Sequence, residues 1–486
     1  MGRSAPHHVV CATPTPVIYF SENIVFEDGM SAGYLHVVAG NFVHVALGTR
    51  RDAKTSATRH RVEFVDFGAL IVSPGLIDAH VHVSAVGGRR WEGYDSASRA
   101  AVAGGTTTMI TMPLNSIPPT TTVSALEMEV REALRPDSRL FTDVGFWGGG
   151  VPSNIRNNDL NELLSDSRVL GVKSFLSPLP PAAGYEAVSP GELFSVAEVA
   201  ASKGVPLLVH CELMSVLEID TLHATAVHRN KSRQFWNYLS TRPAMFEERA
   251  IKELVRILES VRGLRAHVVH LSDAGSLSVI EEAKQRNPGR FTAETCPHYL
   301  FFSADTIPDG ETRLKCMPPI RPSDNRETLW KGLRAGIIDF LSSDHSPCLP
   351  EMRHLTAGNF LDAWGGISGI QFNLASTWTE ARKRGFSPFH LSKWWSEAPA
   401  KLSGVWCKKG SISKGKQADF VVWDANKETI SDTAYHRHAG SPYVGMKLYG
   451  EVRHTFVAGR EVFRFDEDVG ARHFEESSCG RILHRE

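Results

Sequence analysis

The chain has 486 residues and a formal net charge of -1, with 42% hydrophobic and 22% charged residues. This balance is typical of a soluble globular protein, and the near-neutral charge leaves no basic excess that would argue for binding to nucleic acid or to an anionic membrane. No apolar run approaches the roughly 20 residues that a membrane-spanning helix needs. The length predicts a barrel-sized domain together with a smaller one.

The two ends of the chain share one pattern. Residues from about 15 to 70 and from about 410 to 465 alternate short β-type runs with turns. We therefore predict that residues 1–70 and 406–465 form the two parts of one small β-sandwich domain. Residues 466–486 are polar and charged, and we expect them to form a peripheral tail.

Residues 71–405 have a different rhythm, in which short apolar runs alternate with stretches of helical period. Eight such runs, each followed by a helical stretch, are the number found in a (β/α)8 TIM barrel, so an α/β fold is predicted. The expected strands are 75–80, 106–114, 139–146, 170–176, 205–210, 265–271, 291–296 and 337–342.

The location of the protein is indicated by its N-terminus and its cysteines. The first residues lack the apolar stretch of a secretory signal. The seven cysteines are scattered and form no Cys-x-x-Cys pair. An odd count in a chain of this size argues against a disulfide framework. These features predict a cytoplasmic protein, with an organellar address left open.

Metal-ligating residue types end several of the expected strands. His80 and His82 are two residues apart, and side chains at i and i+2 of a strand lie on the same face. His210 and His270 end the fifth and sixth strands, and Asp344 follows the eighth. Catalytic groups of such barrels lie at the C-terminal ends of the strands, so these five side chains should meet at one mouth.

This constellation resembles the amidohydrolase superfamily over nearly the whole chain. The resemblance implies two metal ions, held by His80, His82 and Asp344 at one position, by His210 and His270 at the other, and bridged by a carbamylated Lys173. An ammonium group has no lone pair for a metal, whereas a carbamate offers two oxygens and a negative charge. The two ions of each subunit are expected to be Zn²⁺, because the ligands are nitrogen and oxygen atoms. Mn²⁺, Co²⁺ and Fe²⁺ are the alternatives.

The resemblance also implies a mechanism. Two divalent ions that share a water lower the pKa of that water to near neutrality, so hydrolysis by a binuclear metal-bound hydroxide is expected. Asp344 is the predicted catalytic residue, which takes the proton of the hydroxide and delivers it to the departing nitrogen.

Further motifs resemble the allantoinases within this superfamily. The runs at 112–116, 294–300 and 315–321 look like that group. Dihydroorotases carry an Arg where this chain has Ser84, and dihydropyrimidinases carry a Tyr where it has Pro178. One departure is the Ser-Ala-Val-Gly-Gly stretch that begins at Ser84, where bacterial and plant allantoinases have an acidic loop.

The function implied is hydrolysis of the hydantoin-ring amide of allantoin to allantoate in purine catabolism. The alternative is a dihydropyrimidinase or hydantoinase that acts on another cyclic amide. A non-catalytic scaffold of the same fold is a third interpretation, disfavoured because such scaffolds lack several metal ligands. The resemblance also implies a homotetramer that binds a small molecule.

Residues for substrate contact are predicted with less support from pattern. Asn115 is expected to hydrogen-bond the substrate, and Cys316 and Gly366 are expected to line the pocket. His298 and His345 are expected either to orient metal ligands or to be ordinary core histidines.

Overall fold

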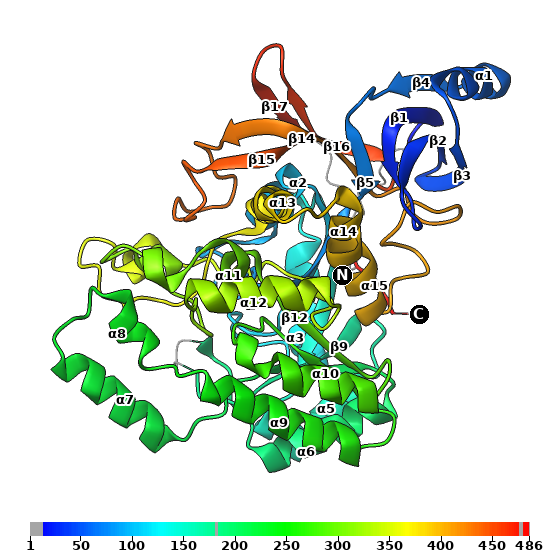
Figure 1. The fold of residues 1–486 in the computed structure, drawn as a ribbon. Helices are drawn as coiled ribbons and strands as arrows, with labels where there is room; N and C mark the ends of the chain where they lie inside the picture. Colours follow the sequence, from blue (N-terminus) through cyan, green and yellow to red (C-terminus); the bar gives the residue numbers. More distant parts are fainter. Residues whose placement is uncertain (1–12, 180–182, 476–479, 486) are drawn as a thin grey trace, which may run out of the picture.

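The computed structural model describes residues 13–179, 183–475 and 480–485. Its centre is a barrel of eight parallel strands that follow one another in sequence order (Figure 1). This confirms the (β/α)8 fold predicted from the sequence. The barrel strands are β6 (Leu76–Val81), β7 (Thr106–Thr111), β8 (Asp143–Gly149), β9 (Val169–Phe175), β10 (Pro206–His210), β11 (Arg265–Val268), β12 (Phe291–Thr295) and β13 (Phe340–Leu341).

The first and last barrel strands meet where the expected ligands lie. Val81 and His345 form a parallel bridge between the two strand ends. The His82 amide donates to the His345 carbonyl oxygen at 2.8 Å. Closure of the barrel therefore brings the chain around Asp344 beside the His-x-His segment, across more than 260 residues of sequence.

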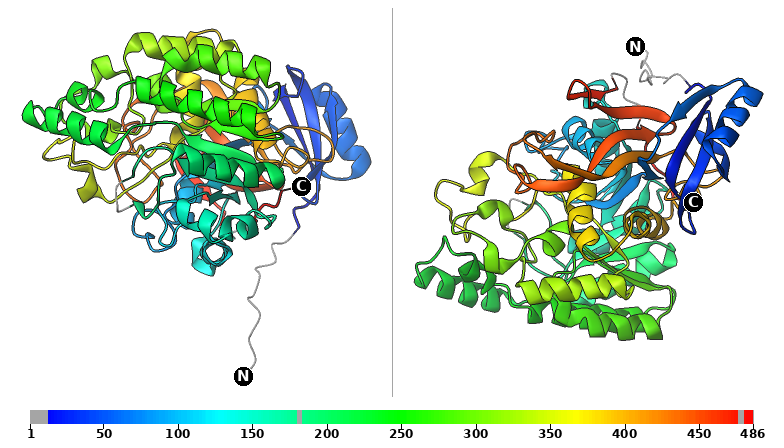
Figure 2. Two further views of the ribbon diagram at one scale, coloured as in Figure 1. Left: turned by 90° about the horizontal axis from the view of Figure 1, so that it is seen from below. Right: turned by 45° about the horizontal axis from the view of Figure 1, so that its top comes forward.

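Helices connect the strands and cover the outside of the barrel (Figures 1 and 2). In α9 the buried apolar positions recur at helical spacing, with Ala250, Leu254 and Leu258 on the inner face. The main connecting helices are α2 (Tyr94–Ala103), α3 (Val123–Ala133), α4 (Pro152–Arg156), α5 (Asp159–Leu163), α6 (Pro190–Ser202), α7 (Val216–His228), α8 (Phe235–Leu239), α9 (Met245–Ser260), α10 (Leu277–Arg286), α11 (Pro297–Phe301), α12 (Ser323–Arg334), α13 (Asn373–Lys383), α14 (Pro388–Ser392) and α15 (Ala398–Leu402).

Both ends of the chain build one nine-stranded sheet beside the barrel. The two parts join where β14 pairs antiparallel with β5, and α1 (Arg50–His60) packs on the N-terminal part. The sheet includes β5 before the barrel and β16 and β17 near the end of the chain. Its strands are β1 (Val17–Val25), β2 (Met30–Val38), β3 (Asn41–Leu47), β4 (Glu63–Asp66), β5 (Ile71–Pro74), β14 (Phe420–Ile430), β15 (Lys447–Val457), β16 (Arg460–Asp466) and β17 (Ala471–Phe474).

Residues 480–485 lie against the barrel, where the sequence analysis expected a peripheral tail. Ile482 forms a parallel bridge with Val144 in β8. The amides of Leu483 and Arg485 donate to the carbonyl oxygens of Val144 and Ser167, each at 2.8 Å. The Arg485 guanidinium also donates to the carbonyls of Val169 and Leu164. Polar composition did not reveal these contacts because most of their partners are backbone groups, which every sequence carries.

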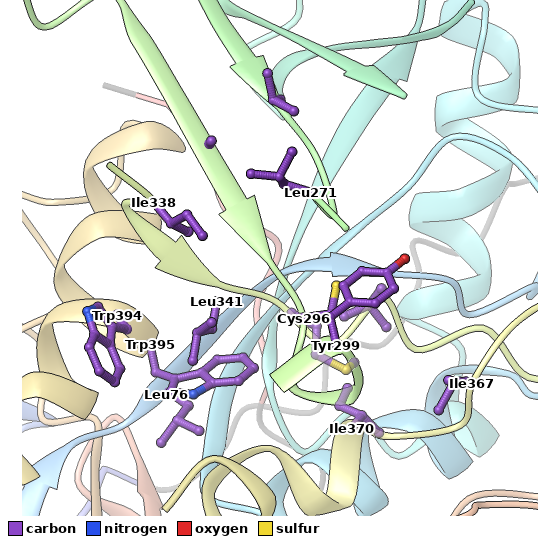
Figure 3. Close-up of a cluster of buried hydrophobic side chains, with 14 of the residues drawn as sticks. Leu76, Leu271, Cys296, Tyr299, Ile338, Leu341, Ile367, Ile370, Trp394 and Trp395 are labelled. Atoms are coloured by element: carbon purple, nitrogen blue, oxygen red, sulfur yellow. The ribbon is translucent and has the colours of Figure 1, made fainter. Parts of the chain in front are cut away.

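A continuous hydrophobic core joins the barrel to its helices. Figure 3 shows one part of it, where Trp395 lies close to Leu76 of β6 and Leu341 of β13. Burial of such side chains stabilises the fold by about 25 cal/mol per Å² of apolar surface. The packing holds the first and last strands together below the strand ends. In the part of the chain that is described, no helix is both long and apolar enough to cross a membrane.

Candidate metal centre

Three of the predicted ligands form a compact buried group. The Nε2 atoms of His80 and His82 each lie 3.3 Å from Asp344 Oδ1. The ligand atoms of the three residues all lie within 4.8 Å of one another. Two imidazoles and a carboxylate at these distances are a group that could hold a divalent cation.

Two of the candidate residues have unusual backbone conformations. Asp344 and His270 have φ angles of 45° and 39°, in the left-handed region that non-glycine residues rarely adopt. Such conformations persist where the surrounding structure imposes them, and they cluster at functional sites. Here they turn the two side chains into the barrel mouth after the strands have ended.

His210 and His270 form a second pair beside the first group. His210 Nδ1 and His270 Nε2 lie 2.9 Å apart. The rings of His80 and His270 have their centroids 5.2 Å apart, so the two groups are neighbours. Phe175, at the end of β9, stacks on the His210 ring at 4.7 Å and limits its rotation.

Lys173 lies on β9 and is completely buried. Its Nζ has no hydrogen-bond partner among the described residues and lies 4.7 Å from the centroid of the Phe175 ring. Burial lowers the pKa of Lys173 to about 7, although the charges of Glu294 and Asp344 act in the opposite direction. A buried amine without a partner is costly.

These observations fit a binuclear metal centre. Four imidazoles and a carboxylate supply the nitrogen and oxygen ligands that zinc and related divalent ions accept. The buried and unpartnered Lys173 amine also fits such a centre, because a carbamate at this position would be an anion with two oxygens for the metals. Each of the six predicted ligands is buried.

Two buried glutamates contact these histidines, and the sequence analysis did not assign them a role. Glu294 Oε1 lies 2.7 Å from His80 Nδ1, and Glu212 Oε2 lies 2.8 Å from His210 Nε2. One signal was present, since Glu212 follows His210 by two residues. The pairing of Glu294 with His80 spans 214 residues, and no local pattern indicates it.

His298 and His345 are the two histidines that the sequence analysis expected either to orient metal ligands or to be core residues, and both are buried. Their imidazoles make no hydrogen bond to any of the six candidate ligands among the described residues. The His345 ring accepts the Gly369 amide at 3.2 Å, and its backbone carbonyl receives the His82 amide. His345 therefore supports the site through its backbone.

A cavity of about 450 Å³ opens onto the metal centre. Asn115 and Gly366 line it, as does Pro178 in place of a tyrosine. Cys316 is not among the described residues that line it; its carbonyl accepts the Tyr238 hydroxyl at 2.7 Å. The size falls within the usual range for small-molecule sites.

The peptide groups of Gly366 are held on both sides. Its amide donates to the Lys315 carbonyl at 2.8 Å, and its carbonyl accepts from the Arg353 guanidinium. A Cβ at this position would lie 2.6 Å from Ser346 Oγ. The backbone thus approaches its neighbours too closely for any larger residue.

Residues 71–462 match the amidohydrolase family. An allantoinase from Arabidopsis thaliana is 42% identical over 95% of this chain and 90% of the relative. An allantoinase from Streptomyces avermitilis is 38% identical over 96% of this chain and 98% of the relative.

The fold has close structural neighbours. An L-hydantoinase (dihydropyrimidinase) from Arthrobacter aurescens superimposes with a TM-score of 0.82 over 97% of this chain and 98% of its own, at 26% identity. The curated relatives are more similar in sequence than this neighbour, and both named above are allantoinases. The chain therefore belongs to the amidohydrolase family and, within it, to the allantoinases.

Proposed function

We propose that this chain hydrolyses the hydantoin-ring amide of allantoin to allantoate with two zinc ions at the barrel mouth. His80, His82 and Asp344 would hold one ion and His210 and His270 the other, with carbamylated Lys173 between them. The observation that carries the proposal is the convergence of four buried histidines and Asp344 from four strand ends onto one cavity. Lys173 is buried behind the cavity wall, with its Nζ 4.7 Å from the centroid of the Phe175 ring that lines it.

The ions, when bound, supply a Lewis acid for the ring carbonyl and lower the pKa of an attacking water. The carboxylate of Asp344 accepts the proton of that water and passes it to the ring nitrogen that leaves. The candidate ligands are buried, and the lower dielectric of a buried site strengthens each of these interactions.

The substrate is neutral and polar, so its recognition requires hydrogen bonds to groups of the cavity wall. Asn115 lines the cavity and offers an amide that both donates and accepts. Gly366 offers close approach of its backbone, which is already held by Lys315 and Arg353. Cys316 lies between Lys315 and Met317, which both line the cavity, and we propose that its backbone shapes the substrate pocket.

We further propose that the protein is a homotetramer, because it resembles this family. We also propose a cytoplasmic location, with an organellar one as the alternative, from the features of its sequence. Sedimentation of the purified protein measures the first, and imaging of a tagged chain measures the second.

The decisive experiment compares four cyclic amides. Purified protein, supplied with zinc and bicarbonate, is assayed on allantoin, hydantoin, dihydrouracil and dihydroorotate, with metal analysis of the same sample. We expect turnover of allantoin to exceed the others and two metals per chain. Turnover of dihydrouracil without turnover of allantoin would exclude the proposed substrate, and fewer than one metal per chain after supplementation would exclude the binuclear centre.

A hydantoinase is the second candidate, because the solved neighbour carries that name and shares the fold. Pro178 on the cavity wall argues against a hydantoinase. This proline occupies the position where dihydropyrimidinases carry their tyrosine. The nearby Tyr185 does not replace that group, because its hydroxyl donates to the Lys173 carbonyl at 2.6 Å.

A further inference from the structure

The candidate ligands include two pairs of histidines, His80 with His82 and His210 with His270. In each pair one imidazole has a ring nitrogen that faces away from the other ligands and contacts a buried carboxylate. In the first group Glu294 Oε1 lies 2.7 Å from His80 Nδ1. In the second group Glu212 Oε2 lies 2.8 Å from His210 Nε2. Both glutamates are fully buried, so each carboxylate depends on its protein partners for hydrogen bonds.

The remaining imidazole of each group has no such support. The Nδ1 atoms of His82 and His270 have no hydrogen-bond partner among the described residues. The arrangement therefore repeats itself, with one supported and one unsupported histidine at each position. The supported rings leave Nε2 of His80 and Nδ1 of His210 facing the candidate metal positions.

Glu294 is itself held from behind. Its Oε2 lies 3.1 Å from His267 Nε2, and His267 Nδ1 lies 2.8 Å from Thr292 Oγ1. The His267 ring stacks on Phe340 at 5.0 Å. These contacts leave the carboxylate little freedom, so the position of Glu294 is set by the barrel interior.

Glu212 is held in a different way. Its Oε2 also accepts a hydrogen bond from Arg242 Nη1 at 2.6 Å. Arg242 lines the substrate cavity, so a cation on the cavity wall and a metal ligand share one carboxylate oxygen. Glu212 therefore lies behind the cavity wall and contacts two residues that line it, Arg242 and the candidate ligand His210.

We propose that Glu294 and Glu212 are the positioning residues of the metal centre, one behind each metal position. Glu294 holds His80 so that it presents Nε2, and Glu212 holds His210 so that it presents Nδ1. The inference rests on the proposed binuclear centre and adds the residues that orient its ligands.

The physical reason lies in the two nitrogens of imidazole. A neutral ring has one N–H and one lone pair, and a carboxylate that accepts the N–H leaves the lone pair on the other nitrogen for the metal. Rotation of the ring would leave the carboxylate without this partner in a buried site, which costs free energy. The carboxylate also makes the ring a stronger ligand.

The test uses Glu294→Gln and Glu212→Gln with Glu129→Gln as a matched control. Glu129, on α3, is also a buried carboxylate, and it accepts from the hydroxyls of Tyr94 and Ser116 rather than from a candidate ligand. Each apoprotein is titrated with zinc in bicarbonate-containing buffer against a chromophoric chelator. Circular dichroism and thermal unfolding of the apoproteins report whether each variant folds.

A second pair of backgrounds separates the two positions. In a His82→Ala chain only the second position keeps all its ligands, so Glu212→Gln should weaken zinc binding there about 10–100-fold. Glu294→Gln should weaken it less, because Glu294 meets the second position only through the His270 backbone amide, 3.3 Å from its Oε1. In a His270→Ala chain the two effects should exchange. In the wild-type background, which keeps both His82 and His270, the Glu129→Gln variant should bind zinc as the wild type does.

Folded variants whose zinc affinity is unchanged would overturn the inference. Equal losses at both positions from either substitution would also overturn it, because that is the result of a general structural role. If a glutamine variant does not fold, Glu294→Asp or Glu212→Asp replaces it with the same expectations, since the shorter side chain withdraws the carboxylate from the ring. A wild type that binds no zinc would instead contradict the proposed function, so the two failures are distinct.

Discussion

Replacing Lys173 by Met should make the metal-free protein more stable while it abolishes catalysis. The Lys173 amine is completely buried, and its Nζ has no hydrogen-bond partner among the described residues. Burial lowers its pKa from 10.5 to about 7, which corresponds to about 5 kcal/mol of lost stability at or below pH 7. Methionine is a flexible apolar side chain that carries no charge into the core.

The stability gained by the variant should depend on pH. The unfolded chain keeps Lys173 protonated up to its ordinary pKa of 10.5, whereas the folded chain releases the proton near pH 7. The penalty in the wild type is therefore complete below about pH 7 and disappears as the pH rises toward 10.5. The difference in stability between variant and wild type should shrink over the same range.

Thermal unfolding in metal-free and bicarbonate-free buffer measures this effect. For 486 residues the unfolding entropy is about 1 kcal/mol/K, so the variant should melt about 5 °C above the wild type at pH 7. Lys315→Met is the matched control. Burial also lowers the pKa of Lys315 to about 7, but its Nζ donates to the carbonyls of Leu361 and Ala363 at 3.1 and 2.5 Å.

The control should therefore gain less stability than Lys173→Met, because two buried carbonyls lose their donor. A Lys173→Met protein that melts at or below the wild-type temperature would refute the argument from burial. With zinc and bicarbonate added, only the wild type should gain stability and activity, since a methionine cannot form a carbamate.

Three further substitutions test the site. Asp344→Asn should lower kcat at least about 100-fold, because an amide cannot accept the proton; a kcat close to that of the wild type would remove Asp344 from the mechanism. Asn115→Ala should raise KM for allantoin about 2- to 10-fold, the worth of one hydrogen bond, and an unchanged KM would take Asn115 out of the substrate contacts. Gly366→Ala should lower both the melting temperature and kcat/KM, since its Cβ would lie 2.6 Å from Ser346 Oγ; normal values in both measurements would show that the loop adapts.

The sequence by itself determined the fold class and the candidate ligands. Eight apolar runs of strand length, separated by helical stretches, predict a parallel barrel because local periodicity reflects which side of an element is buried. The spacing of His80 and His82 places both rings on one face of a strand. The allantoinase-like runs could also be recognised in the sequence, because each of them is a continuous segment.

Only the tertiary structure decided which groups act together across the barrel. Glu294 reaches His80 over 214 residues, and the backbone of residues 480–485 joins β8 through groups that carry no sequence signal. Only the structure also shows that the Lys173 amine has no hydrogen-bond partner among the described residues, because that depends on all the residues that pack around it. Such contacts arise when barrel closure brings distant strand ends together, and a hydrogen bond formed in this way leaves no periodic trace in either segment.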